Sequence, residues 1–141
     1  MATGTAGTNA RDVMMPVTQH LAFVLNYNTT GASSGIQIGT IPANAVILSW
    51  RTRVLTAFNA GTTNPITIGI TATGAEIAAS ASVTSGTAGD YTGAPAASGG
   101  WAQFSSDQAV YTSYIPTGTA ATAGKAIVTI SYISLPACNA V

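Results

Sequence analysis

Residues 46–70, "VILSWRTRVLTAFNAGTTNPITIGI", are the most informative stretch of this chain for predicting its fold. Its first half is rich in apolar and β-branched residues, and the loop "NAGTTNP" separates it from the strictly alternating "ITIGIT". Alternation of apolar with small or polar side chains is typical of a strand that buries one face. The stretch therefore predicts a long β-hairpin with strands at 45–58 and 66–71.

Further short strands are predicted on both sides of this hairpin. Residues 74–82 are the one candidate helix, and a helix, a strand and an irregular turn all stay open for them. Residues 85–100 are Gly, Ala, Ser and Pro almost throughout and predict a long surface loop. The other predicted strands are 20–28, 36–41, 108–115 and 125–135.

Six or more strands at short spacing, with Gly/Pro turns between them, indicate an all-β fold. We expect an antiparallel β-sandwich, jelly-roll-like, with an extended N-terminal arm. The domain organisation would then be an arm at residues 1–19 and a β-sandwich domain at residues 20–141.

The charge content narrows the classes of partner. Only 6% of the residues are charged, with four Lys+Arg, four Asp+Glu and a formal net charge of +0. In a typical soluble domain, roughly 25% of the residues are charged. No basic stripe is available for nucleic acid, and no apolar run reaches the ~18–20 residues needed to span a bilayer. A surface with so few charges favours self-association, so we expect it to belong to an assembly.

Two of the four cationic residues, Arg51 and Arg53, lie together in the longest apolar run. Strand alternation puts both on one face, together with Ile47 and Leu55. One interpretation is a contact face toward another subunit, because arginine is enriched in interface cores. The other is a solvated outer face, and we prefer the contact face. The opposite, core-like face is predicted to carry Val46, Leu48, Trp50, Thr52, Val54, Thr56 and Phe58.

The sequence offers no arrangement that predicts catalysis. His20 is the one histidine, and no nucleophile-elbow pattern G-x-S-x-G accompanies it. One histidine, one cysteine (Cys138) and dispersed acids form no metal-ligand cluster, and no phosphate-binding loop occurs. We therefore expect no enzyme activity, no catalytic residues, no metal and no cofactor.

Two further segments hold candidate contact residues. Within the arm, an apolar patch with a neighbouring cation is expected to touch a neighbouring subunit or another protein; its residues are Arg11, Val13, Met14 and Met15. Around "GAPAASGGW" (93–101), Tyr91 and Trp101 are candidates for an exposed, adhesive loop tip. The alternative, which we prefer for Trp101, is that it closes the end of the sandwich together with Phe104.

Three segments between Phe23 and Gly69 carry a family resemblance: "FVLNYN", "GIQIGTIPANAVI" and "AFNAGTTNPITIG". In their order the chain resembles a group of small structural proteins of tailed bacteriophages. These are described as head-decoration (cement) or head-fibre proteins and are built as β-sandwiches. The match covers about a third of the chain, and it specifies a virion structural protein better than an exact position on the particle.

The resemblance implies a capsid decoration protein on the outer surface of the phage head. Its partners would be the major capsid protein and further copies of itself, often as a homotrimer. It offers no catalytic residues. Two alternatives stay open: a head- or tail-fibre module that recognises the host, and a self-assembling shell or tube subunit.

Overall fold

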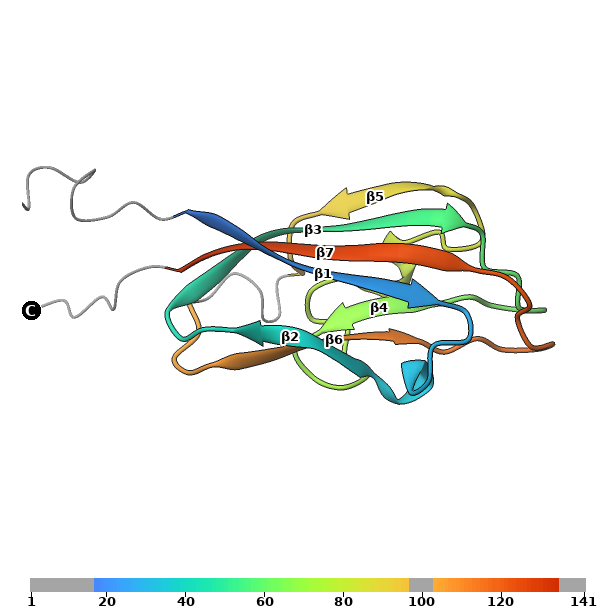
Figure 1. Ribbon diagram of the computed structural model, residues 1–141, viewed down its shortest axis with the longest axis horizontal. Coiled ribbons are helices and arrows are strands. Elements are labelled where there is room, and N and C mark those ends of the chain that lie inside the picture. Colours follow the sequence, from blue (N-terminus) through green and yellow to red (C-terminus); the bar gives the residue numbers. More distant parts are fainter. Residues whose placement is uncertain (1–16, 97–102, 135–141) are drawn as a thin grey trace, which may run out of the picture.

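The computed structural model describes residues 17–96 and 103–134, and these form two antiparallel β-sheets (Figure 1). The all-β, antiparallel prediction is confirmed. Short 3-10 turns lie at Ala32–Ser34 and Ser80–Ser82. The strands are β1 (Thr18–Asn26), β2 (Ile36–Ile41), β3 (Ala45–Thr56), β4 (Ile66–Gly69), β5 (Gly89–Gly93), β6 (Gln108–Tyr114) and β7 (Lys125–Ser134).

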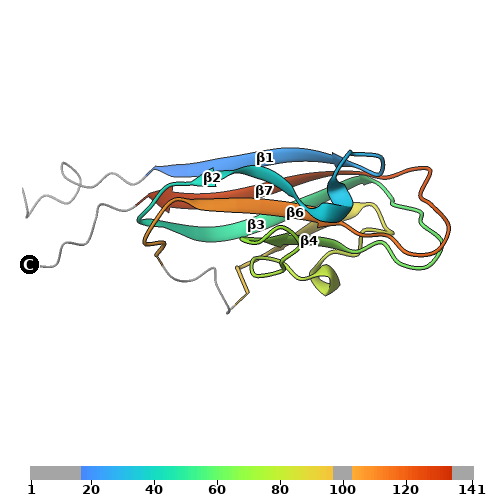
Figure 2. The same ribbon diagram turned by 90° about the horizontal axis from the view of Figure 1, so that it is seen from below.

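Consecutive strands alternate between the two sheets. The odd-numbered strands form a four-stranded sheet in the order β1-β7-β3-β5, and the even-numbered strands form a three-stranded sheet in the order β2-β6-β4. Figure 2 shows the strands of both sheets running along the long axis of the molecule. Because every connection crosses from one sheet to the other, neither sheet contains two named strands that are consecutive in the sequence.

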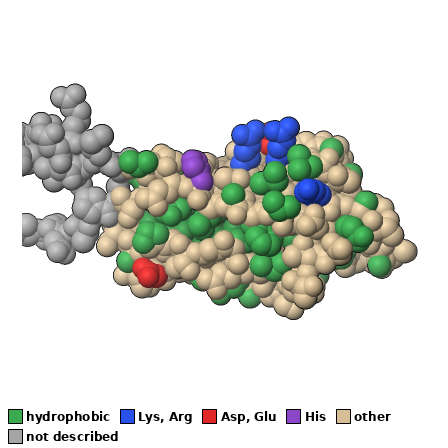
Figure 3. Space-filling view, viewed as in Figure 1, with side chains coloured by type: hydrophobic (Ala, Val, Ile, Leu, Met, Phe, Trp, Pro, Cys, Tyr) green, Lys and Arg blue, Asp and Glu red, His purple; other side chains and the backbone are tan. Residues whose placement is uncertain are grey.

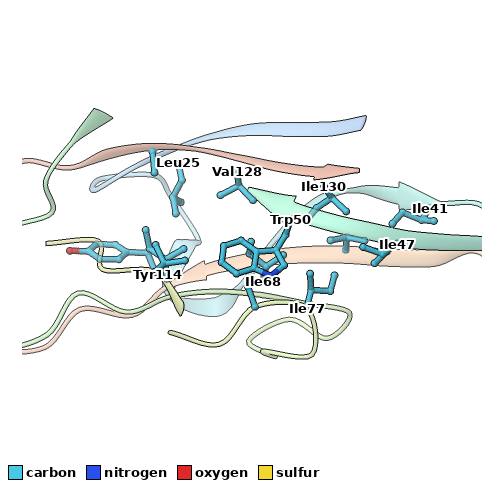
Figure 4. Packing of buried hydrophobic residues seen from close by; sticks show 14 of the residues in the cluster. Leu25, Ile41, Ile47, Trp50, Ile68, Ile77, Tyr114, Val128 and Ile130 are labelled. Carbon is cyan, nitrogen blue, oxygen red and sulfur yellow. The ribbon is translucent and has the colours of Figure 1, made fainter. Parts of the chain in front are cut away.

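The core lies between the inner faces of the two sheets (Figure 4). Trp50 is 4% exposed, and its indole N–H donates to the carbonyl of Ala94 at 3.1 Å, which satisfies the one polar atom of the ring. Phe58 and Tyr114 pack as a tilted aromatic pair with ring centroids 4.6 Å apart. Other members of the cluster are Leu25, Ile41, Ile47, Ile66, Ile68, Ile77, Val110, Val128 and Ile130.

The predicted faces of β3 are wrong at the beginning of the strand. Its pairing with β7 shifts register between Ile47 and Ser49, so Ile47 is 1% exposed and Leu48 is 42% exposed, the reverse of the expectation. A second shift between Val54 and Thr56 leaves Thr56 exposed, whereas Leu55 is exposed beside Arg53 as predicted. A β-bulge inserts one residue and so exchanges the two faces, which strict alternation misses.

From Trp50 to Val54 the alternation holds as predicted. Trp50, Thr52 and Val54 are buried, and Arg51 and Arg53 are exposed on the outer face. Val46 is only half-buried and Thr56 is exposed, so the predicted core face shrinks to the middle of the strand and Phe58 beyond it.

The prediction of one long loop over residues 85–100 is also wrong, because β5 lies within it. Tyr91 pairs with Thr52 of β3, is half-buried against the core, and donates its hydroxyl to the carbonyl of Thr87 at 3.1 Å. It is therefore a strand residue and not a loop tip. Pairing with β3 overrides the poor strand propensity of the flanking glycines. Trp101 lies outside the described residues, whereas Phe104 is buried in the core.

The candidate helix at 74–82 contains only the 3-10 turn Ser80–Ser82. Just before it, Ala78 exchanges both backbone hydrogen bonds with Ile68 of β4, at 3.0 and 2.9 Å. This segment therefore lies along the outer edge of β4.

Thr52 gives a direct test of the core. Its side chain is 0% exposed, and its hydroxyl has no hydrogen-bond partner among the described residues. We predict that Thr52→Val, which keeps the shape and removes the unsatisfied hydroxyl, raises the free energy of unfolding by about 1 kcal/mol. Denaturant unfolding measures the change. Thr52→Ala is the control and is expected to destabilise, because it opens a cavity; destabilisation by valine would contradict this packing.

Candidate contact surface

Three of the four Lys+Arg residues of the chain lie on the outer face of the four-stranded sheet. The register brings them together: Arg53 lies opposite Ile127, and Lys125 opposite Thr56. Figure 3 shows the cationic side chains on one side of the molecule, with hydrophobic side chains beside them. We call this surface the cationic face; it comprises Arg51, Arg53, Lys125, Asp90, Val24, Leu55 and Ile127.

Arg51 is held by Asp90 from the neighbouring strand β5. Its Nε lies 2.8 Å from Oδ1 and its Nη2 lies 2.5 Å from Oδ2, so the guanidinium donates a hydrogen bond to each carboxylate oxygen. The hydrogen bond from Arg51 lowers the pKa of Asp90, and the charges of Arg51 and Arg53 add to that effect. The side chains are 58% and 40% exposed, and such surface pairs orient a side chain more than they stabilise a fold.

Arg53 and Lys125 form no ion pair within the part of the chain that the structure describes. Three cations against one carboxylate leave the cationic face with a net charge of +2. Arg53, Leu55 and Asp90 also line a shallow hollow of about 380 Å³ between β3 and the beginning of β5. This hollow can receive a side chain from outside, and an acidic one would meet an unpaired guanidinium.

Apolar side chains surround these charges. The register aligns Val24, Ile127, Arg53 and Asp90 in one row across all four strands. Val24 and Leu55 are 45% and 43% exposed. Arginine next to exposed aliphatic side chains is a combination enriched in protein interfaces.

Among the described residues, the two acids away from this face have structural partners. Asp107 accepts a hydrogen bond from the backbone N–H of Ala43 at 2.9 Å and so holds the turn between β2 and β3. Glu76 accepts from the N–H of Ile70 at 3.1 Å and from the hydroxyl of Thr71 at 2.9 Å. Burial opposes ionisation of Glu76, but the hydrogen bonds outweigh it, and the pKa of Glu76 is lowered.

His20 is exposed on β1, where its Nδ1 lies 3.0 Å from the hydroxyl oxygen of Ser131. Among the described residues, no group of three or more His, Cys, Asp or Glu side chains is placed to hold a metal ion. In the same residues, no helix has the length and apolar character needed to cross a membrane.

The other candidate contacts fall where the structure gives no description. Arg11, Val13, Met14 and Met15 of the arm lie outside the described residues, as do Trp101 and Cys138. Of the predicted contact residues, the structure brings together Arg51 and Arg53.

Sequence reasoning missed Asp90 as the partner of Arg51 and missed Lys125 as the third cation of the face. The signal for Asp90 was present in "GDYTG" (89–93), where alternate residues Asp90 and Thr92 flank Tyr91 as in a short strand. The glycines around it obscured that pattern. Lys125 joins the face only through the register of β7, which a single sequence does not reveal.

Chains from three phage capsid structures share this fold. One, from the cyanophage Pam1 capsid asymmetric unit, has a TM-score of 0.60 at 15% identity over 84% of each chain. Another, from the acidic stable capsid structure of Helicobacter pylori bacteriophage KHP30, has a TM-score of 0.59 at 13% identity, covering 85% of this chain and 91% of that one. A third, from the capsid of Ralstonia phage GP4, has a TM-score of 0.55 at 20% identity, covering 85% and 84%. No family model and no curated protein matches the chain.

The lowered pKa of Glu76 gives a pH prediction. A carboxylate with a lowered pKa in the folded state contributes stability above its unfolded pKa and loses it as the pH falls through the folded value. We expect Glu76→Gln to cost about 1 kcal/mol of unfolding free energy at pH 7. The difference from wild type should shrink as the pH falls below the ordinary glutamate range. Urea unfolding between pH 7 and pH 3 measures it, and a difference that stays constant would contradict the role given to Glu76.

Proposed function

We propose that this chain is a virion structural protein of a bacteriophage, and specifically a capsid decoration (cement) protein on the outer surface of the head. The observation that carries the proposal is the likeness in fold, over more than four fifths of the chain, to chains of three phage capsid structures. The low-charge surface supports membership of an assembly. The role is mechanical and not enzymatic.

The strand order also agrees with a jelly roll. An eight-stranded jelly roll has two four-stranded sheets, and its fourth and fifth strands are neighbours at the edge of one of them. Here the Ile68–Ala78 bridge occupies the edge of the smaller sheet, at the position of the missing eighth strand. We therefore class the sandwich as a jelly roll with one strand reduced to a bridge.

The partners we propose are the major capsid protein and further copies of this chain, arranged as a homotrimer. A trimer that engages several capsid subunits gains avidity, because each later contact forms at high effective concentration. Binding to the expanded shell and not to its precursor stabilises the expanded shell by mass action. Individually weak contacts are sufficient for such a role.

We assign the capsid contact to the cationic face. Arg53 and Lys125 carry charge without an ion pair in the described residues, and Arg51 is fixed in place by Asp90. Val24 and Leu55 supply apolar area beside them. The matching surface on the capsid would present carboxylates bordered by aliphatic side chains. Residues Arg11, Val13, Met14 and Met15 of the arm are a second proposed contact, toward the capsid or a neighbouring copy.

A fibre or host-recognition module is less well supported. That function was based on aromatic side chains at an exposed loop tip, and Tyr91 is a half-buried strand residue with its hydroxyl bonded to Thr87. A self-assembling shell or tube subunit shares the low-charge surface, and self-assembly without a capsid protein would favour it.

Particles of the encoding phage that lack this protein test the proposal. We expect such particles to assemble but to release DNA at a temperature several degrees below that of complete particles. Adding the purified protein back should restore the release temperature, as followed with a DNA-binding dye. Equal release temperatures, with no binding of the added protein, would contradict a cement role.

The cationic face is tested by charge reversal at Arg53. We expect Arg53→Glu to weaken binding to capsid shells about tenfold or more, with a loss of salt dependence. Its melting temperature should move by less than about 3 °C, because the side chain is exposed. Gln37→Ala, on the exposed edge of the other sheet, is the matched control. Unchanged shell binding by Arg53→Glu would place the contact elsewhere.

A further inference from the structure

The four sheet edges of the sandwich differ in how they are protected against strand addition. β5 has five residues and β4 has four, and the edge of β4 is already occupied by Ala78. β2 has six residues, and its pairing shifts register between Gln37 and Gly39. Short edges, bulges and covering segments are the usual devices that prevent edge-to-edge pairing.

Within residues 17–96 and 103–134, β1 has none of these devices. It has nine residues, TQHLAFVLN, and pairs with β7 in an unbroken register from Thr18 to Asn26. It contains no proline, lysine, arginine or acid, and His20 is its one ionisable side chain. A long, regular and uncharged edge is a template for pairing with another strand.

The hydrogen bonds at the end of β1 show which backbone groups face the open edge. Asn26 donates its N–H to Thr29 Oγ1 at 2.8 Å and accepts from the N–H of Thr29 at 3.0 Å, so it points away from β7. Tyr27 donates to the carbonyl of Gly124, on the β7 side. Because backbone direction alternates along a strand, the N–H and C=O groups of four residues face the open edge. These residues are Thr18, His20, Ala22 and Val24.

Apolar side chains lie along the inner margin of the same edge. Leu21 and Phe23 are only half-buried, although both pack against the core. Figure 3 shows a band of hydrophobic side chains along the middle of the molecule. Figure 1, in the same view, shows β1 above the middle of the molecule and β2 below it. A strand added beside β1 would cover this margin as well as satisfy the backbone groups.

We propose that the open edge of β1 pairs antiparallel with β1 of a second copy of this chain. The two edges have equal length and bring no like charges together, since the cationic face is centred on β3 and the beginning of β7. A two-fold axis at Leu21 pairs all four outward-facing residues at once, Thr18 with Val24 and His20 with Ala22 of the second copy. The product is a continuous sheet of eight strands, four from each copy.

This contact goes beyond the proposed function and does not depend on it. In a trimeric decoration protein, a two-fold contact of this kind joins a copy in one trimer to a copy in the next. Trimers would then be linked to each other as well as to the shell.

Ala22→Pro tests the pairing at the backbone. The N–H of Ala22 faces the open edge, so proline there removes an outward donor and leaves the hydrogen bonds to β7 intact. We expect the mass measured by light scattering to fall below the wild-type value, because copies joined at β1 separate. Ala22→Thr, which keeps the N–H and favours a strand, is the control and should keep the wild-type mass. An unchanged mass in a folded Ala22→Pro protein, or a monomeric wild type at all concentrations, would overturn the proposal.

A cross-link tests the register and does not require the proline variant to fold. In a Cys138→Ser background, Leu21→Cys places two cysteines across the two-fold axis, within the ~4.4–6.8 Å Cα separation that a disulfide needs. We expect mild oxidation to give a covalent dimer. Phe23→Cys is the control, because its cysteines lie about four residues apart along the strands, roughly 13 Å. Absence of a Leu21→Cys dimer would overturn the proposal, and a mass change on removing residues 1–16 would then identify the arm as the occupant of the edge.

Discussion

The structure depends on the pairing of β3 between β7 and β5 in the larger sheet. Through this pairing Trp50, Thr52 and Val54 enter the core, and Arg51 and Arg53 point outward beside Asp90 of β5. The bulges at the two ends of this segment turn Leu48 and Thr56 to the surface. One strand therefore supplies the centre of the core on one side and the centre of the cationic face on the other.

The two proposed contact surfaces both belong to the four-stranded sheet. The outer face of this sheet carries most of the cationic charge of the chain, beside exposed apolar side chains. This combination suits a partner protein that presents carboxylates. The β1 edge of the sheet carries backbone donors and acceptors and almost no charge, which suits another strand. The two surfaces do not compete, because the hydrogen bonds of an edge lie in the plane of the sheet and the arginines project from it. In the decoration role that we propose, the face would contact the shell and the edge would contact another copy.

The sequence was sufficient for the fold class and for most strands, because period-two alternation is a local property of residues such as Ile66, Ile68 and Ile70. Prediction from the sequence failed where the pairing between strands determines the local structure. The bulge at Leu48 depends on the pairing of β3 with β7. The short strand around Tyr91 depends on its pairing with β3, and the glycines around it obscure its local alternation. The outward position of Arg51 and Arg53 was predictable from spacing, whereas the roles of Asp90 and Lys125 required the register of β5 and β7.

We propose that this chain decorates the outer surface of a phage head. A cryo-electron microscopy reconstruction of purified particles of the encoding phage tests it most directly. We expect density for the sandwich on the outside of the shell, with the outer face of the β1-β7-β3-β5 sheet against the major capsid protein. Density confined to the tail or fibres, or particles that lack the protein, would contradict it.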